Sequence, residues 1–490
     1  GASLTLNGGV DLAGGTRVIS QAGNSLTIGG VISNGAITLS NTTASRTLTL
    51  GGVNTYSGAT TVAGGTLAFS GSGSSVNSAF NLTGTAGTPT LDISAATTGT
   101  TIGSLASTST ASVVLGAKVL TAGGDNSSTI VDGAISGAGG SLVKTGTGSM
   151  MLTASNSYTG GTTLNAGSIE VRNANALGTG TLVFNGGALG AGVSTRTLTN
   201  AITISNTASF GGVGTNTASM ILNGNIDLAG GTRVITQPGN SLTLGGVISN
   251  GALTISNTTA SRSLTLTGAN TYTGATTIMG GTVTLTGAGA ISSSSALNLS
   301  AANTGATFDI SGITASGMTV GSLASGASGT LALGGKALTA GGDNSSTTVA
   351  GTISGTGGSI TKTGSGTLTI SSSNSYTGGT TLSAGVLDIR NDNAVGTGTL
   401  VIGGGTIASY GGARTLANAV TLSNNFSIGG LGSGTTINGN VDLAGGTRTI
   451  THLGNSFLFG GVLSNGALTL DSTSGSRTLA LGAANTYSGA

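Results

Sequence analysis

The sequence predicts an all-β protein, a right-handed parallel β-helix (β-solenoid) with about 20 residues per coil. Three observations favour this class. The composition is rich in glycine and poor in charge, short segments alternate apolar residues with Ser or Thr, and these segments recur at a nearly constant spacing. The right hand of the helix is the usual hand of parallel crossover connections.

The composition excludes several other classes. The 490 residues include 94 Gly, 2 Pro and no Cys, and only 5% are charged, against about 25% in an ordinary soluble domain. Each interior glycine costs a helix about 1 kcal/mol relative to alanine, so a helical protein is not expected. A disordered chain would need high net charge, whereas the net charge is +2. Collagen would need glycine at every third position.

The alternating segments have the period-2 pattern of strands with one buried face. Gly-Gly, Asn-Gly and Thr-Gly pairs between the segments supply the backbone conformations that tight corners need. Three such segments, at 241–244, 263–266 and 282–285, follow one another at the spacing of successive solenoid coils. A second column with similar steps is predicted through Leu142, Leu164, Leu182 and Ile202.

In a parallel solenoid each strand pairs with its counterpart in the next coil, about 4.8 Å away. Each coil would bury about five aliphatic side chains, at roughly 1.5–3 kcal/mol apiece before chain entropy is subtracted. A single coil is not stable alone, so stability comes from stacking. An antiparallel sandwich shares the alternation but does not explain the stacked register. We therefore expect Leu242, Leu264 and Val283 to lie over one another.

A larger repeat organises the chain. The segment Val10–Arg17 recurs at Ile226–Arg233 and again at Val441–Arg448. The spacing between the first and second copies is nearly equal to the spacing between the second and third. This predicts one continuous solenoid over residues 1–490, with internal units of approximately 10–225, 226–440 and a partial 441–490. Because Asn485–Ala490 matches the first part of a segment completed at Asn54–Thr61, we expect the chain to be part of a longer protein.

A shorter motif, Asn-x-Tyr-x-Gly, occurs five times. Two copies, here called the lysine copies, are preceded by a Lys-x-Gly-x-Gly segment; the other three, the short copies, are not. The residues of the motif are Asn54, Tyr56, Gly58, Lys144, Asn156, Tyr158, Gly160, Asn270, Tyr272, Gly274, Lys362, Asn374, Tyr376, Gly378, Asn485, Tyr487 and Gly489.

The lysine copies, at 141–169 and 359–387, resemble the autotransporter-associated β-strand repeat, also called the passenger-associated transport repeat. This resemblance implies a right-handed parallel β-helix in the secreted passenger of a large bacterial surface protein. It implies a location outside the cell or at the cell surface, an association of the motif with export and folding, and an outer-membrane translocator elsewhere in the full protein.

Repetition also bears on catalysis, because a reaction centre normally needs one unique cluster. Most charged residues instead recur in each unit, which indicates corner hydrogen bonds or ion pairs between coils. The recurring sets are Arg17, Arg233 and Arg448; Arg46, Arg262 and Arg477; Lys118 and Lys336; Lys144 and Lys362; Arg172 and Arg390; Arg196 and Arg414; Asp11, Asp227 and Asp442; Asp92 and Asp309; Asp125 and Asp343. We therefore expect no enzyme activity and no catalytic residue.

The unpaired residues do not change that expectation. His452 is the only histidine. Its counterparts in the earlier units are Gln21 or Ala22 and Gln237 or Pro238, so we expect an exposed substitution at a corner. A Ser-His-Asp triad would need an orienting acid beside it. Glu170 is replaced by Asp388 in the next copy, and the single acids Asp132, Asp392 and Asp471 lie far apart in the sequence.

Three binding interpretations compete with structural ones. The segments Gly-Gly-Asp-Asn at 123–126 and 341–344 are similar to calcium-binding β-roll turns, but calcium needs six to eight oxygens, so side-chain-stabilised turns are favoured and no metal is expected.

Tyrosines could stack on sugars, but Tyr56 and Tyr158 are separated by several coils. Packing of each Tyr across a corner that Asn closes and Gly turns is favoured instead. Outward Thr columns are typical of ice-binding solenoids, but Ser, Ala and Asn interrupt them.

These observations predict a structural protein. No cofactor is expected, and scattered basic residues argue against nucleic-acid binding. The favoured function is a stiff rod or fibre for adhesion, aggregation or filament formation, with self-association (lateral or end-to-end) or another cell surface as partner, since little charge keeps copies apart. A passive stalk for a domain outside this sequence is the alternative. A solenoid polysaccharide hydrolase or lyase and an intracellular scaffold are less favoured.

Overall fold

A computed structural model describes residues 3–23, 25–212, 218–239, 241–429, 434–454, 456–472 and 478–487. Every regular element among them is a β-strand and every strand pairing is parallel, which confirms the all-β parallel solenoid. The chain divides into two compact units, one comprising Gly1–Ala229 and Arg233–Gly246 and the other Gly230–Thr232 and Val247–Ala490.

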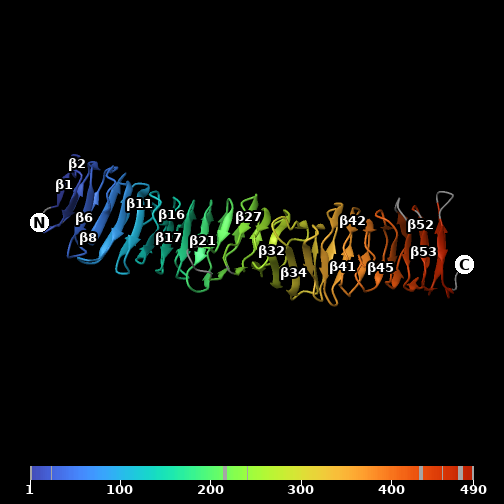
Figure 1. The fold of residues 1–490 in the computed structure, drawn as a ribbon. Helices are drawn as coiled ribbons and strands as arrows, with labels where there is room; N and C mark the ends of the chain where they lie inside the picture. Colours follow the sequence, from blue (N-terminus) through green and yellow to red (C-terminus); the bar gives the residue numbers. More distant parts are fainter. Residues whose placement is uncertain are drawn as a thin grey trace. The chain divides into compact units, whose positions relative to one another are not determined.

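The first unit is built of stacked coils (Figure 1, blue to green). The strands of these coils form three walls. The first wall includes β11 (Gly99–Ser107), β13 (Val119–Ala122), β16 (Ser141–Lys144), β18 (Gly161–Leu164), β20 (Leu182–Phe184) and β23 (Ile202–Ile204). The second includes β14 (Thr129–Val131), β17 (Ser149–Leu152), β19 (Ser168–Val171) and β21 (Ala188–Ala191). The third includes β1 (Leu4–Leu6), β4 (Leu26–Ile28), β7 (Thr47–Leu50), β10 (Pro89–Ala96), β12 (Ser112–Val114) and β15 (Ala134–Ser136).

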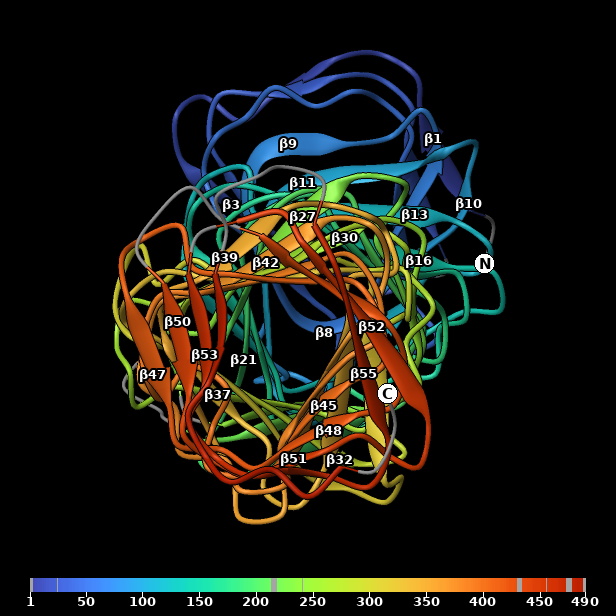
Figure 2. The same ribbon diagram turned by 90° about the vertical axis from the view of Figure 1, so that its right-hand side faces the viewer.

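The second unit has the same three walls. The first includes β35 (Gly317–Val320), β38 (Ala337–Ala340), β41 (Ser359–Lys362), β43 (Thr380–Leu382), β45 (Leu400–Ile402), β48 (Val420–Leu422), β51 (Val441–Asp442) and β54 (Leu463–Ser464). The second includes β42 (Thr367–Ile370), β44 (Val386–Ile389), β52 (Thr447–His452) and β55 (Ala467–Asp471). The third includes β34 (Ala306–Ile313), β37 (Gly329–Ala332), β40 (Thr352–Ser354), β47 (Arg414–Leu416), β50 (Thr435–Ile437) and β53 (Phe457–Phe459). Figure 2 shows β45, β48 and β51 on one side of these coils, β47, β50 and β53 on a second, and β52 and β55 on a third.

Neighbouring coils pair like over like. Leu4, Leu26 and Leu48 are register partners in turn, and Leu264 pairs with Val283, which pairs with Phe308. The mean coil has about 22 residues, slightly more than expected. Inward side chains of each wall are almost completely buried, so the core is a stack of aliphatic and phenyl groups inside the walls.

One predicted column was wrong at a single position. Leu142 pairs with Thr162, and Thr162 with Leu182, whereas Leu164 lies over Lys144 and under Phe184. The column from Leu142 to Ile202 therefore runs through Thr162 and Leu182 in equal steps. Leu164 misled the prediction because it is also inward-facing, two positions along the same strand.

Candidate functional site

The asparagine of the Asn-x-Tyr-x-Gly motif connects three successive coils. The side-chain Oδ1 of Asn156 accepts a hydrogen bond from the backbone nitrogen of Ile135 in the preceding coil, at 2.8 Å. Its Nδ2 donates to the carbonyl oxygen of Ala176 in the following coil, at 2.6 Å. Asn156 is only 4% exposed, so these bonds form inside the wall.

The other described copies repeat this geometry. The Oδ1 atoms of Asn54, Asn270, Asn374 and Asn485 accept from the backbone nitrogens of Ile32, Ile248, Ile353 and Leu463 at 2.8–2.9 Å. The Nδ2 atoms of Asn54, Asn270 and Asn374 donate to the carbonyls of Ser74, Ala290 and Ala394 at 2.7–3.1 Å. The motif therefore replaces a wall strand: the asparagine side chain pairs with backbone groups that a strand would otherwise satisfy.

The wall that is replaced differs between the two kinds of copy. In the lysine copies the asparagine lies over β15 or β40, in the third wall. In the short copies it lies over β5 (Ile32–Ser33), β29 (Ile248–Ser249) or β54, in the first wall. The same local structure thus occurs at two rotational positions around the coil.

Four of the motif tyrosines point into the core. Tyr56, Tyr158, Tyr272 and Tyr376 are at most 1% exposed, whereas Tyr487, in the last described coil, is partly exposed. Each of the four hydroxyls shares a hydrogen bond with a threonine four residues later, at 2.5–2.7 Å, and the partners are Thr60, Thr162, Thr276 and Thr380. Burial raises the pKa of all four tyrosines, and the hydrogen bond to threonine lowers it in part. A buried ring has no face available for a sugar.

These threonines were not among the residues predicted to matter from the sequence. The signal that could have found them is the recurrence of Thr at the fourth position after each of the four buried tyrosines. In the short copies the network extends to a further serine, because Thr60 also bonds Ser78 at 2.8 Å and Thr276 bonds Ser295 at 3.2 Å.

The motif glycines are needed for close approach between coils. Gly58, Gly160, Gly274 and Gly378 lie at bends, but none has a positive φ. A Cβ on Gly160 would lie 2.5 Å from the carbonyl oxygen of Gly139 in the preceding coil, a distance that no side chain tolerates. Gly489, the glycine of the fifth copy, lies outside the described residues.

In the lysine copies the lysine caps a corner from inside. Lys144 is 1% exposed, and its Nζ donates to the carbonyl oxygens of Thr145, Gly146 and Ala166 at 2.5, 3.0 and 3.5 Å. Lys362 donates in the same way to Thr363, Gly364 and Ala384 at 2.5, 2.9 and 3.3 Å. The third carbonyl belongs to the following coil, so this ammonium also joins successive coils.

Burial lowers the pKa of Lys144 and of Lys362, and the nearby carboxylates Asp125 and Asp343 oppose that shift. Asp125 and Asp343 also hold turns, since their Oδ1 atoms accept from the backbone nitrogens of Ser127 and Ser345 at 2.9 Å. The next residues, Asn126 and Asn344, have φ values of 63° and 62°, a conformation that asparagine tolerates.

A different polar cluster lies near the corner of the first short copy. The Nδ2 of Asn41, which is 1% exposed, donates to Gln21 Oε1 at 2.6 Å, and Gln21 Nε2 donates to the carbonyl of Thr47 at 2.9 Å. Arg46 also donates to the carbonyl of Gln21. Neutral amides thus connect coils where the lysine copies use an ammonium, which the missing lysine alone did not predict.

His452 is equivalent by repeat position to Gln21 of this cluster, and its burial contradicts the prediction made from the sequence. It occupies the repeat position that Gln21 and Gln237 hold in the earlier units. It is 1% exposed, so the expectation of an exposed corner residue was wrong. Its backbone is at the inward-facing end of β52, paired with Ile428. A single substitution at a turn-like sequence position gave no indication of that inward orientation.

The remaining charges are used locally. Glu170 pairs with Arg172, and Asp388 with Arg390, at 2.8 Å, with both carboxylates buried and both guanidinium groups partly exposed. These pairs lie within one coil, not between coils. Arg17, Arg233 and Arg448 each donate Nε to the carbonyl of the leucine five residues earlier, at 2.8–3.0 Å. Among the described residues, no group of three or more His, Cys, Asp or Glu side chains could hold a metal ion.

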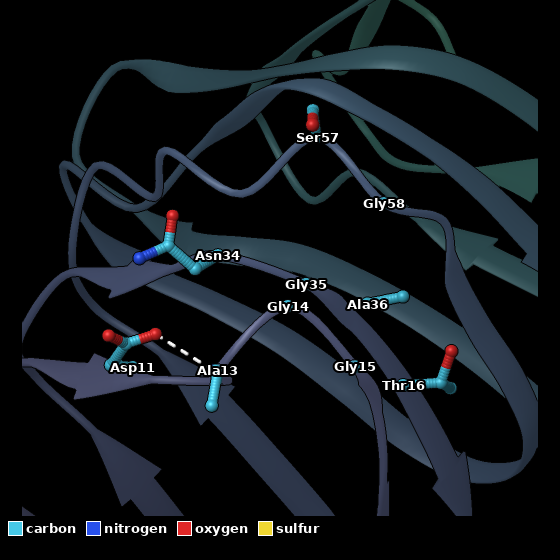
Figure 3. A pocket seen from close by; sticks show the side chains of 10 residues that line it. All are labelled: Asp11, Ala13, Gly14, Gly15, Thr16, Asn34, Gly35, Ala36, Ser57 and Gly58. Carbon is cyan, nitrogen blue, oxygen red and sulfur yellow. Dashed lines mark hydrogen bonds between the residues drawn. The ribbon is translucent and has the colours of Figure 1, made fainter.

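A surface hollow of about 530 Å³ lies over three successive corners of the first unit. Figure 3 shows Asp11 beside the Ala13–Gly15 turn, Asn34 on the next coil and Ser57 on the third. Asp11 is the one acid in its lining, and its Oδ1 accepts from the backbone nitrogen of Ala13 at 2.8 Å. A lining with one carboxylate lacks the pair of acids that glycoside hydrolysis uses.

Comparisons with known proteins agree with this geometry. A family model described as the passenger-associated transport repeat matches residues 45–69, 142–171, 262–285, 360–389 and 472–490. The second and fourth matches cover the lysine copies, and the other three cover the short copies. No solved structure is significantly similar to this chain, and the described residues contain no helix of the length and apolarity needed to cross a membrane.

A curated relative is the adhesin BmaC autotransporter of Brucella suis biovar 1 (strain 1330), which is 32% identical over 276 residues. The matched stretch is 55% of this chain and 8% of the adhesin, so the chain spans a small part of that relative's length. Passenger repeats of this kind lie outside the cell, associated with the outer-membrane surface. The chain therefore carries five passenger-associated transport repeats on a parallel β-solenoid, and over part of its length it is similar to an autotransporter adhesin.

Proposed function

We propose that this chain is a structural segment that forms a stiff rod or fibre and supports adhesion, aggregation or filament formation at the bacterial surface. The observation that carries the proposal is the inward use of the motif. The amide of Asn156, the hydroxyl of Tyr158 and the ammonium of Lys144 all bond groups of the protein itself. The motif residues therefore strengthen the walls, and contact with other molecules falls to the outward faces.

The proposal includes no catalytic step. Support comes from the acids with the deepest burial, Glu170 and Asp388, which are each held by an arginine. A glycoside hydrolase would need a pair of carboxylates within about 5–10 Å of each other on an accessible face. The similarity to an adhesin also favours a binding or structural role.

Deletion of one internal unit tests the proposal in the full protein on its own cells. Removing residues 10–225 joins Gly9 to Ile226, which occupies the repeat position of Val10, so the coil register is kept. At matched surface amounts, measured with an antibody, we expect the deletion to reduce adherence or cell aggregation at least several-fold. Unchanged adherence and aggregation would overturn the structural contribution proposed here.

A passive stalk is the second candidate, because the matched stretch is only 8% of the adhesin's length and such a protein has room for other domains. The same deletion separates the two. A stalk predicts unchanged binding of soluble ligand per molecule, with adherence between cells reduced only through shorter reach. An outer-membrane translocator elsewhere in the full protein is proposed as the partner for export in either case.

A further inference from the structure

The first wall of the first unit carries an unbroken outward row of β-branched residues. Thr101 pairs with Thr121, and the register continues through four more coils to Thr203. We call this row the ladder of the first unit, and its members are Thr101, Thr121, Val143, Thr163, Val183 and Thr203. All six side chains are partly exposed.

The second unit carries a matching row on its own first wall. Thr319 pairs with Thr339, and the register continues to Thr421 through six consecutive coils. The ladder of the second unit consists of Thr319, Thr339, Thr361, Thr381, Val401 and Thr421. Each ladder is followed by an acid, since Thr203 pairs with Asp227 and Thr421 with Asp442.

The outward row beside each ladder carries no charged side chain. The adjacent outward row is Gly99, Val119, Ser141 and Gly161 in the first unit, and Gly317, Ala337 and Ser359 in the second. The only lysines of these strands, Lys144 and Lys362, point into the core. Lys118 and Lys336 directly precede β13 and β38, and Asp125 and Asp343 follow these strands, so these four charges lie at the edges of the first wall. Asp92 and Asp309 are on the third wall, and the Glu170–Arg172 and Asp388–Arg390 pairs are at the second.

We propose that each ladder docks face to face on a ladder of a second copy of this chain. The inference rests on the proposed function in its self-associating form and names the surface responsible. A partner for this face must be flat, uncharged and ridged at the spacing of parallel strands, about 4.8 Å. The ladder has all three properties, so two copies can place the rows of one between the rows of the other, as packed sheets do.

The area of the face sets the strength of the contact. Six stacked positions extend about 24 Å, and with one further outward row they cover roughly 14 Å of width, or about 340 Å² per ladder. This is less than half of the ~800 Å² per partner of a standard stable interface. The association through one ladder is therefore weak, reversible and concentration-dependent.

The test is sedimentation equilibrium of the 490-residue chain over a range of concentrations. The face variant carries Thr163→Lys and Thr381→Lys, one outward lysine in the middle of each ladder. The matched control carries Thr49→Lys and Thr330→Lys, which are outward, partly exposed positions of β7 and β37 on the third wall. Circular dichroism checks that all three proteins keep the strand content of the parent.

We expect the average mass of the parent and of the control to rise together with concentration. The face variant should associate at least about tenfold more weakly, because like charges would oppose each other across the contact. Equal association of the face variant and the control would overturn the assignment of this surface while leaving self-association standing. A strictly monomeric parent would overturn the inference itself, and the cell-adherence test of the proposed function would still be decided separately.

Discussion

The side chain of Asn156 accepts a hydrogen bond from the backbone nitrogen of Ile135 in the preceding coil, and it does so where the chain has no strand. A coil that lacks one wall strand would leave the strand below with unpaired backbone groups. The asparagine Oδ1 supplies the acceptor, and its Nδ2 donates to the carbonyl oxygen of Ala176 in the following coil. The motif is therefore a way of omitting a strand without losing the continuity of the stack.

Replacing Asn156 by alanine should cost about 1–3 kcal/mol, because it leaves a buried donor and a buried acceptor unsatisfied. The expected readouts are a lower urea midpoint by circular dichroism and faster hydrogen exchange at the Ile135 amide. Asn165→Ala is the matched control, since Asn165 and Asn185 form an exposed pair at 2.9 Å. Equal effects of the two substitutions would contradict the role given to Asn156.

Lys144→Met keeps most of the buried stem but removes the ammonium from the carbonyls of Thr145 and Gly146. We expect a loss of about 1–3 kcal/mol and early proteolytic cleavage near residues 145–148. Lys118→Met is the control, because Lys118 is at the surface and donates to Thr97 at 3.0 Å. Wild-type resistance to protease in Lys144→Met would show that the corner does not need its cap.

Alkaline pH should destabilise the protein through its buried tyrosines. Burial raises the pKa of Tyr158, Tyr272 and Tyr376 well above the ordinary 10.0, so above pH 10 only the unfolded chain releases these protons. Their contribution is therefore complete below pH 10 and is lost as pH rises. The two buried lysines act in the opposite direction, because burial lowers their pKa below 10.5 and stability gains as pH passes upward through that range.

The tyrosines outnumber the lysines, so we expect a net loss of stability between pH 10 and 12, measured by urea unfolding at each pH. Tyr158→Phe should make the dependence shallower by up to about 1.4 kcal/mol per pH unit, the effect of one proton. A slope that is identical in Tyr158→Phe and in the parent would mean that this phenol is not protected by folding.

Gly160→Ala should destabilise the stack by about 1–3 kcal/mol, because its Cβ would lie 2.5 Å from the Gly139 carbonyl oxygen. Gly124→Ala is the control, since a Cβ at Gly124 would contact nothing within 4 Å and its φ is not positive. Thermal unfolding distinguishes the two. Tolerance of both substitutions would show that the coils are not in the close contact described.

His452→Gln should be tolerated, with a change within about 0.5 kcal/mol, because glutamine occupies the equivalent positions 21 and 237. His452→Lys places an ammonium at a position that is 1% exposed. It should lower the free energy of unfolding several-fold more than His452→Gln does. Thermal unfolding of both variants at neutral pH checks this pair. Equal stability of His452→Lys and the parent would indicate that the site opens to solvent.

The stacking of coils could be predicted because each strand repeats the same alternation, as at Ser263–Leu266 and Thr282–Val283. The exact register could not, because two inward residues of one strand are equivalent by pattern; Leu142 and Leu164 illustrate this. The recurrence of Asn156 and Lys144 marked them as structural candidates, but their partners are backbone groups of residues 135, 145, 146, 166 and 176. A hydrogen bond to a backbone group does not depend on the partner's side chain, so the sequence does not reveal which residue the partner is.

The orientation of isolated residues was also beyond the sequence. His452 pairs with Ile428 of the preceding coil, and such a pairing is visible only after the coils are aligned in space. The ladders were similarly hidden, because the sequence showed Thr columns as interrupted by other residues. In the folded wall, Val143, Val183 and Val401 take the place of threonine in these rows, and valine is likewise β-branched and uncharged.

The most direct test of the parallel stacking is a pair of engineered cysteines, since the chain has none of its own. Thr330 and Thr352 are register partners on β37 and β40, which places their Cα atoms about 4.8 Å apart, within the range of a disulfide. Thr307, on β34, pairs with Thr330 and is therefore two coils from Thr352, about 9.6 Å away. Mild oxidation should form an intramolecular disulfide in the Thr330→Cys/Thr352→Cys variant and not in the Thr307→Cys/Thr352→Cys variant; the reverse result, or no disulfide in the first variant, would contradict the parallel stack.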